Sequence, residues 1–298
     1  VEEVLRAKEI LPDFEGPDGW NYTHRRTPEA DIYFVACEGA PTKELPAECT
    51  FRVRGKQPEL WDPATGRIQQ AADWRSTEDG RTVVRFPLPE NGSMFVVFRR
   101  EGQTPPTLAP KILPGAKAPV ETLLLAGPWE VRFQPGRGAP ASAVFDQLIA
   151  WNEHPDEAIR YFSGTAVYQK TFELSAEQAG RSVWIDLGGV HCVAQVRLNG
   201  KDLGVVWTAP WRLEAAGAVR AGRNQLEIAV TNTWVNRLIG DAGLPPEKRI
   251  TQTNIALRAG KRPPNFRPLQ GFSSEEPLRP SGLVGPVRLE FFEGPGGR

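Results

Sequence analysis

Short apolar runs bounded by turn-forming residues are the feature that most constrains the fold of this chain. Its 298 residues include 29 glycines and 28 prolines, which are dispersed along the sequence rather than gathered in low-complexity blocks. The runs between them are rich in Val, Ile, Phe, Trp and Thr, residue types that favour strands. This pattern predicts an all-β fold.

The segment VRLNGKDLGVVW, residues 196–207, shows the pattern most clearly. Apolar and polar residues alternate from Ala194 to Leu198, which is typical of a strand with one buried face. The alternation stops at Asn199-Gly200, a pair that tolerates the positive φ of a two-residue hairpin turn. We therefore expect two antiparallel strands joined at this pair.

Composition shifts divide the chain into four predicted parts. Residues 1–19 begin at Val1 rather than at methionine and show helical spacing up to Ile10, which predicts a short N-terminal helix, the tail of a missing upstream domain. Residues 20–100 predict a small β-sandwich. Residues 101–120 contain five prolines and predict a Pro-rich linker. Residues 121–298 predict a second sandwich, of the jelly-roll type.

Charge and hydropathy argue against two classes of partner. Lys plus Arg and Asp plus Glu number 36 each, so no net field favours nucleic acid or an anionic membrane surface. The sequence has no apolar run of about 18 residues, the length that a membrane-spanning helix needs. We expect neither nucleic acid nor a membrane as a partner.

Three cysteines leave the redox state open. Cys37, Cys49 and Cys192 have no zinc-ligand spacing. Either Cys37 and Cys49 bridge two neighbouring strands in an oxidising compartment, or they are buried free thiols.

Tryptophans at strand ends and in loops are the candidate ligand contacts. An exposed aromatic ring can stack on the apolar face of a pyranose, while amide groups bond its hydroxyls. The alternative role of each tryptophan is to pack in the core or on an adjoining domain. The predicted carbohydrate-binding residues are Trp207, Trp211, Trp234, Asn232 and Trp151.

Acidic residues suggest no catalytic pair. Glycoside hydrolysis ordinarily needs two carboxyl groups that flank the scissile bond, and the acids outside strand edges are better explained as surface or capping residues: Glu153, Asp156, Asp241, Glu275 and Glu276.

His24 either approaches an active site built upstream or is a loop histidine with ordinary hydrogen bonds. Residues 238–282 form a long polar insertion whose basic side chains either bind a polysaccharide or dock a missing domain.

The second half resembles the galactose-binding-like domain of glycoside hydrolase family 2. The resemblance rests on four elements in order: GTAVYQKTFEL, RSVWIDLGGVHCVAQVRLNGKDLGVVW, PWRLEAAGAVRAGRNQLEIAVTN and SGLVGPVRLE. It implies a jelly-roll sandwich. A structural calcium ion is common in such modules, but the sequence does not locate one.

Further segments are similar to the carboxy-terminal region of glycoside hydrolase family 106, the α-L-rhamnosidases. They are HRRTPEADIYFV, FRVRGKQPELWDPATG, GSMFVVFRR and WNEHPDEAIRYFSGTAVYQKTF. The family implies an upstream barrel with two catalytic glutamates and calcium, and no position here matches those residues. The resemblance thus implies a non-catalytic accessory part, with the barrel and a plant or microbial glycan as partners and a periplasmic or secreted location. The alternatives are a free-standing lectin-like module and an autonomous glycoside hydrolase.

Overall fold

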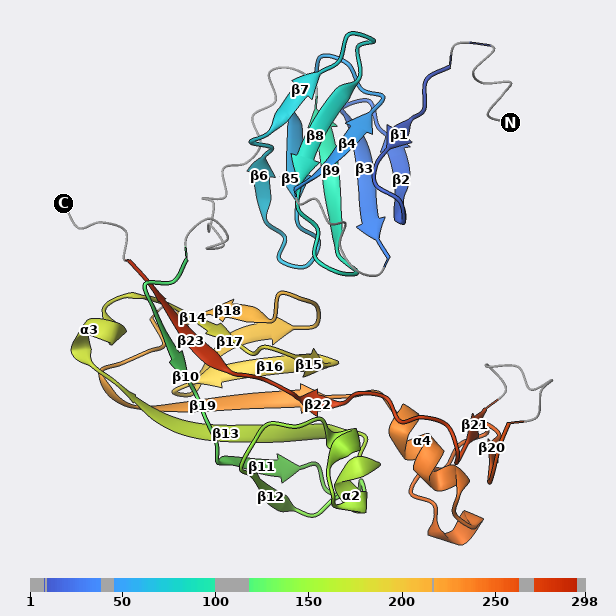
Figure 1. The fold of residues 1–298 in the computed structure, drawn as a ribbon, viewed down its shortest axis with the longest axis vertical. Helices are drawn as coiled ribbons and strands as arrows, with labels where there is room; N and C mark the ends of the chain where they lie inside the picture. The colour runs from blue at the N-terminus through green and yellow to red at the C-terminus, as the bar shows by residue number, and fades with distance from the viewer. Residues whose placement is uncertain are drawn as a thin grey trace. The chain divides into compact units, whose positions relative to one another are not determined.

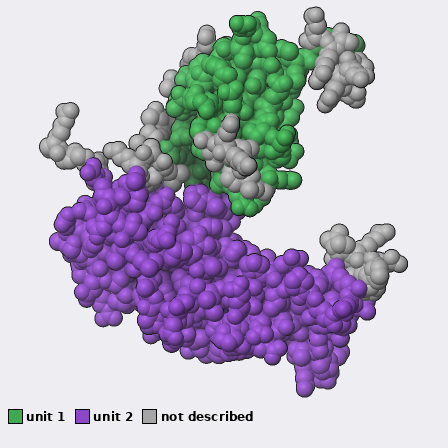
Figure 2. All heavy atoms as spheres, viewed as in Figure 1, with its two compact units in different colours: residues 1–113 green, residues 114–298 purple. Residues whose placement is uncertain are grey.

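Strands make up most of the regular structure, which confirms the all-β prediction. The computed structural model describes residues 8, 10–38, 46–99, 118–215, 217–262 and 271–293. The chain divides into two compact units, Val1–Leu113 and Pro114–Arg298, coloured separately in Figure 2. The point of division falls inside the predicted linker. Most of that linker, residues 101–117, and nearly all of the predicted N-terminal helix lie outside the described residues.

Unit 1 consists of two antiparallel sheets (Figure 1). The four-stranded sheet has the order β1-β4-β8-β7, and the five-stranded sheet has the order β2-β3-β9-β5-β6. Their strands are β1 (Phe14–Glu15), β2 (Trp20–Arg26), β3 (Ala30–Cys37), β4 (Ala47–Phe51), β5 (Pro58–Trp61), β6 (Ile68–Gln70), β7 (Trp74–Ser76), β8 (Thr82–Phe86) and β9 (Ser93–Arg99).

Aromatic side chains from both sheets meet in the core of unit 1. The ring of Phe51 on β4 lies 4.9 Å from Tyr33 on β3 and 5.4 Å from Phe98 on β9, measured between centroids. These contacts join the sheets into the predicted sandwich. The sandwich begins earlier than predicted, because β1 pairs with β4 from Phe14 onward. Residues 14–19 therefore belong to unit 1 rather than to a separate tail.

Unit 2 is a second sandwich of two larger sheets. The four-stranded sheet has the order β10-β23-β14-β18, and the six-stranded sheet has the order β12-β11-β13-β19-β16-β17. Their strands are β10 (Glu121–Leu124), β11 (Trp129–Phe133), β12 (Ser142–Phe145), β13 (Thr165–Leu174), β14 (Ser182–Asp186), β16 (Val193–Leu198), β17 (Lys201–Val206), β18 (Arg212–Glu214), β19 (Gly222–Thr231) and β23 (Arg288–Phe292). All pairings within both sheets are antiparallel.

Short helices and two small sheets complete unit 2. They are the helices η1 (Trp151–Glu153), α2 (Glu157–Arg160), α3 (Ala176–Ala179), α4 (Val235–Ala242) and η2 (Pro246–Lys248), and the strand pairs β15 (Val190–His191) with β22 (Gly282–Leu283) and β20 (Leu257–Arg258) with β21 (Phe272–Ser273). Figure 1 shows α4, β20 and β21 gathered beyond the ends of β19 and β22. The segment expected to be a long insertion thus has secondary structure of its own.

The predicted hairpin at Asn199-Gly200 is confirmed. Leu198 pairs with Lys201 across the turn, and both turn residues have positive φ, 53° at Asn199 and 81° at Gly200. The Asn199 side chain also fixes the turn to the rest of the unit, because its Nδ2 donates 2.8 Å hydrogen bonds to the carbonyl oxygen of Ala218 and to Oδ1 of Asn224. The residue that permits the turn therefore also anchors it.

Candidate functional site

Trp151, one of the predicted sugar contacts, lies in the core of unit 2. Its ring is fully buried, and its Nε1 donates a 2.5 Å hydrogen bond to the hydroxyl of Tyr168. Its backbone N–H donates to the carbonyl oxygen of Ser281 at 2.8 Å. Trp151 therefore presents no ring face to a ligand in this structure, and its contacts are those of a core residue.

Trp207 and Trp211 differ in exposure. Trp207 follows the edge strand β17 and is 58% exposed, and Val205 beside it in sequence is also exposed. Trp211 is half-buried and packs against the hydrophobic core. Of these two predicted contacts, Trp207 is the one with a largely free aromatic surface.

Trp234 stands at the start of α4 and already has a cationic neighbour. The ring is 41% exposed, and the guanidinium carbon of Arg137 lies 4.4 Å from its centroid. This geometry is a cation–π contact, which occupies one face of the indole. A stacked sugar would have to use the other face or displace Arg137.

Asn232 is held by backbone groups. Its Oδ1 accepts from the N–H of Gly164, and its Nδ2 donates to the carbonyl oxygen of Phe162, both at 2.9 Å. The side chain thereby links the end of β19 to the residues that precede β13. The carbonyl and amide groups of the Asn232 side chain are thus engaged in hydrogen bonds that hold the backbone in place.

A pocket of about 420 Å³ opens between α2 and α4 in unit 2. Such a volume lies within the usual range of small-molecule sites. None of the five predicted contact residues lines it. The lining residues are Glu157, Ala158, Tyr161, Arg237, Ile239, Gly240, Gly243, Leu244 and Ser274.

Arg237 is the charged group of this pocket. It is only 6% exposed, and its Nε lies 3.0 Å from Oδ1 of the fully buried Asp241, one helical turn further on. Oδ2 of Asp241 accepts from the backbone N–H and the hydroxyl of Thr251, at 2.7 and 2.6 Å. The contact with Asp241 is an ion pair without hydrogen-bond geometry, and no described residue accepts a hydrogen bond from the terminal Nη1 and Nη2 atoms of Arg237.

The sequence predicted a surface or capping role for Asp241 and did not predict this pocket. Asp241 is instead a buried counterion. The available signal was the i, i+4 spacing of Arg237 and Asp241 among the apolar residues Leu238, Ile239 and Ala242, which is helical spacing.

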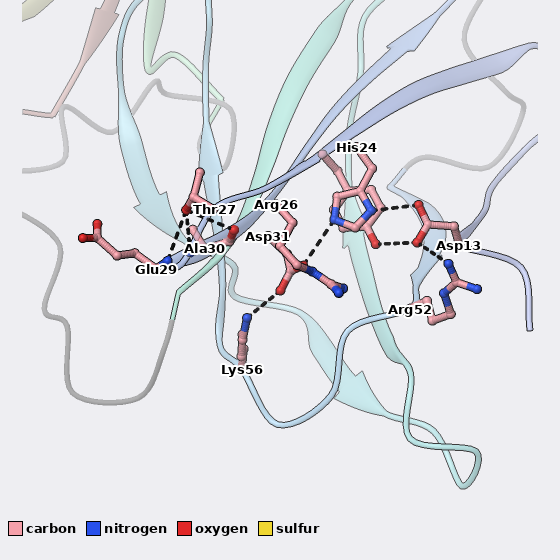
Figure 3. Close-up of polar contacts among 10 residues, drawn as sticks. Asp13, His24, Arg26, Thr27, Glu29, Ala30, Asp31, Arg52 and Lys56 are labelled. Atoms are coloured by element: carbon pink, nitrogen blue, oxygen red, sulfur yellow. Dashed lines mark hydrogen bonds and ion pairs between the residues drawn. The ribbon is translucent and has the colours of Figure 1, made fainter.

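A second polar cluster surrounds His24 in unit 1 (Figure 3). His24 lies on β2, not on the predicted loop. Its Nδ1 is 2.9 Å from Oδ2 of Asp13 and its Nε2 is 3.3 Å from Oδ1 of Asp31. The imidazole also stacks on Tyr33, with the ring centroids 3.9 Å apart and the planes 14° from parallel.

Cations hold both carboxylates of this cluster. Arg26 Nε and Lys56 Nζ each donate to Asp31 at 2.5 Å, and Arg52 lies 3.2 Å from Asp13. Burial alone would raise the pKa of Asp31, but the hydrogen bonds and charges of Lys56 and Arg26 outweigh it and lower that pKa.

The hollow beside this cluster contains no free base. It is an open depression lined by Asp13, His24, Arg26 and Arg52. Both ring nitrogens of His24 already face carboxylates, and Arg52 also donates to the carbonyl oxygen of Leu11 at 2.9 Å. The cluster therefore fixes the chain around residues 11–13 to the sheet.

The described part of the chain contains neither a cluster of metal-ligating side chains nor a helix that could span a membrane. Within the described ranges no three His, Cys, Asp or Glu side chains are grouped closely enough to hold a metal ion. No described helix is long and apolar enough to cross a membrane.

Comparisons with known proteins link both units to carbohydrate-active enzymes. Residues 1–75 match the family of alpha-L-rhamnosidases, glycoside hydrolase family 106, and residues 138–258 match the galactose-binding domain-like family of glycosyl hydrolase 2. The solved structure of the rhamnosidase from Novosphingobium sp. PP1Y aligns over 97% of this chain, with a TM-score of 0.69 and 39% identity. This chain is a relative of the family 106 rhamnosidases. The resemblance inferred from sequence motifs is confirmed.

The relatives are much longer than this rhamnosidase-like chain. A curated protein of Formosa agariphila, named "Putative beta-glucuronidase", is 38% identical over 225 residues, 68% of this chain. The chain spans 26% of the Novosphingobium rhamnosidase and 19% of the F. agariphila protein. The part of this chain that matches the galactose-binding domain-like family of glycosyl hydrolase 2, residues 138–258, lies within the second β-sandwich.

Proposed function

We propose that this chain is the non-catalytic accessory part of a rhamnosidase-like glycoside hydrolase, and that its second unit binds carbohydrate. The non-catalytic part of this proposal rests on the number of carboxyl groups that line the hollow beside His24 and the pocket between α2 and α4. Among the described residues, Asp13 is the one carboxyl group that lines the hollow of unit 1, and Glu157 is the one that lines the pocket of unit 2. Hydrolysis of a glycosidic bond ordinarily needs two, on opposite sides of the bond.

The electrostatics of the carboxyl groups support the same proposal. A general acid for glycoside hydrolysis has a raised pKa, so that it carries a proton at neutral pH. Four described carboxyl groups have a clearly displaced pKa, and in each case the displacement is downward: Asp31, Glu48, Asp79 and Asp202. Such groups stay ionised and serve as hydrogen-bond acceptors or ion-pair partners.

Carbohydrate binding is supported by the galactose-binding domain-like match and by exposed aromatic surface. Trp207 and Trp234 retain large exposed areas, and an exposed aromatic ring suits the apolar face of a pyranose. The same surfaces favour a free-standing lectin-like module as the second candidate. That candidate predicts sugar binding by this chain alone, lost in folded Trp207→Ala or Trp234→Ala variants.

An activity assay of the purified chain tests the non-catalytic proposal. The substrates are p-nitrophenyl α-L-rhamnopyranoside and p-nitrophenyl β-D-glucuronide, with the Novosphingobium rhamnosidase as the positive control for the first. We expect no release of nitrophenol above that of the heat-denatured chain. Sustained turnover that Asp13→Asn or Glu157→Gln abolishes would overturn the proposal in favour of an autonomous hydrolase.

A further inference from the structure

We propose that the pocket between α2 and α4 binds one uncharged pyranose unit, with Arg237 as its principal hydrogen-bond donor. This inference rests on the carbohydrate-binding half of the proposed function and assigns it a place. The pocket is distinct from the exposed tryptophan surfaces, because none of the predicted contact residues is among its lining residues.

Arg237 is preorganised to donate. The side chain is 6% exposed, its Nε forms an ion pair with Asp241, and the ring of Tyr161 lies 5.8 Å from the central carbon of the guanidinium. Gly240 leaves room for the free end, since a Cβ there would lie 2.6 Å from Nη2. A planar guanidinium held in this way presents Nη1 and Nη2 as a fork that fits two adjacent hydroxyl oxygens, with little conformational entropy left to lose.

The charges around the pocket select an uncharged ligand. Asp241 neutralises Arg237, and Glu157 is the remaining carboxylate in the lining. A sugar acid would bring its carboxylate close to Glu157, which is electrostatically unfavourable. Sugar hydroxyls, in contrast, can donate to Glu157 and accept from Arg237, so a neutral polyol can use both groups.

The remaining lining residues suit the apolar part of a sugar ring. Ala158, Ile239 and Leu244 contribute aliphatic surface, and Ser274 adds a hydroxyl. Apolar walls with a few convergent polar groups are the usual composition of a small-ligand site. A pocket of about 420 Å³ holds one monosaccharide but not a long oligosaccharide.

Calorimetric titration of the whole chain with methyl α-L-rhamnopyranoside, methyl α-D-galactopyranoside, methyl α-D-glucopyranoside and methyl β-D-glucopyranosiduronate tests the site. We expect at least one neutral glycoside to bind and the glucuronide to bind more weakly or not at all. Arg237→Lys keeps a cation beside Asp241 but removes the fork, so we expect affinity to fall about tenfold or more. Ala158→Trp fills the pocket from α2 and should abolish binding even if the lysine variant folds poorly.

Trp74→Ala is the matched control, because Trp74 is an exposed tryptophan on β7 of unit 1 that lines neither hollow. It should bind like the unmodified chain. Binding that survives both pocket variants but is lost in Trp207→Ala would overturn the assignment, as would absence of binding by all three neutral glycosides. Neither result affects the non-catalytic proposal, which depends on the turnover assay alone.

Discussion

Trp151 and Tyr168 form a hydrogen-bonded pair inside unit 2, with the indole Nε1 donating to the phenol oxygen at 2.5 Å. Both side chains are fully buried. The same phenol oxygen accepts from the backbone N–H of Leu283 at 3.3 Å. The pair therefore connects η1, β13 and β22 at one point in the core.

Tyr168→Phe should destabilise unit 2. The substitution removes the hydroxyl that accepts hydrogen bonds from the indole N–H of Trp151 and from the backbone N–H of Leu283, so two buried donors lose this partner. We expect the free energy of unfolding to fall by about 2–4 kcal/mol. Urea denaturation checks this. Tyr161→Phe is the control, and a loss of less than about 0.5 kcal/mol for Tyr168→Phe would contradict the prediction.

Asn224→Ala should be costly for a similar reason. Asn224 is fully buried, and its Oδ1 accepts from the N–H of Arg220 and from Nδ2 of Asn199, while its own Nδ2 donates to the carbonyl oxygens of Arg220 and Gly222. We expect a loss of about 2–4 kcal/mol in urea unfolding. Asn254→Ala, at an exposed position, should change stability by less than about 0.5 kcal/mol, and equal effects of the two substitutions would refute this role.

Acid should weaken unit 1 through Asp31. Its pKa in the folded chain is lowered, so its contribution to stability is fully present above the unfolded pKa of about 4 and is lost as the pH falls through the folded value. We expect the free energy of unfolding to decrease below about pH 5. The Asp31→Asn variant should be less stable than the unmodified chain at pH 7. Its free energy of unfolding should also decrease less as the pH falls.

Urea unfolding between pH 7 and pH 3 measures both effects of Asp31→Asn. Asp18→Asn is the control, since Asp18 is an exposed carboxylate of the same unit. Parallel pH profiles for the Asp31→Asn variant and the unmodified chain would show that Asp31 does not carry the acid sensitivity.

Thiol labelling should distinguish the two cysteine alternatives. The structure has Cys37, Cys49 and Cys192 as free thiols, with the first two buried. Burial raises the pKa of Cys49 to about 12, and Cys37 donates to the carbonyl oxygen of Pro89 at 3.1 Å. With Ellman's reagent at pH 8 we expect at most Cys192 to react in the folded chain and all three thiols after unfolding without reductant. A single thiol after unfolding would indicate a Cys37–Cys49 disulfide.

Local patterns in the sequence were sufficient to predict much of the fold. The hairpin at Asn199-Gly200 needed only alternation and a turn pair, both of which act over a few residues. The strand β2 was not predicted, because most of its side chains are exposed and polar and give no alternation of hydrophobicity. Its pairing with β3 comes from the sheet rather than from its own sequence.

The burial of Trp151 could not be predicted from its neighbours in sequence. Space for the indole depends on Gly282, far along the chain, where a Cβ would lie 2.6 Å from Nε1. The pocket was missed for a related reason, because Arg237 and Asp241 fall at the edge of a Pro-rich polar segment that conceals the helix α4. A position at the end of a predicted strand therefore does not show whether the ring of a tryptophan is exposed.

The pairing of β10 with β23 brings the two ends of unit 2 together. Glu121 faces Phe291 across this pair, and the N–H of Val120 donates to the Phe291 carbonyl oxygen at 2.8 Å. A sandwich whose entry and exit strands are neighbours can be transplanted between host proteins without unpairing its inner strands. The geometry thus suits a module that can be inserted into a longer chain at a single point.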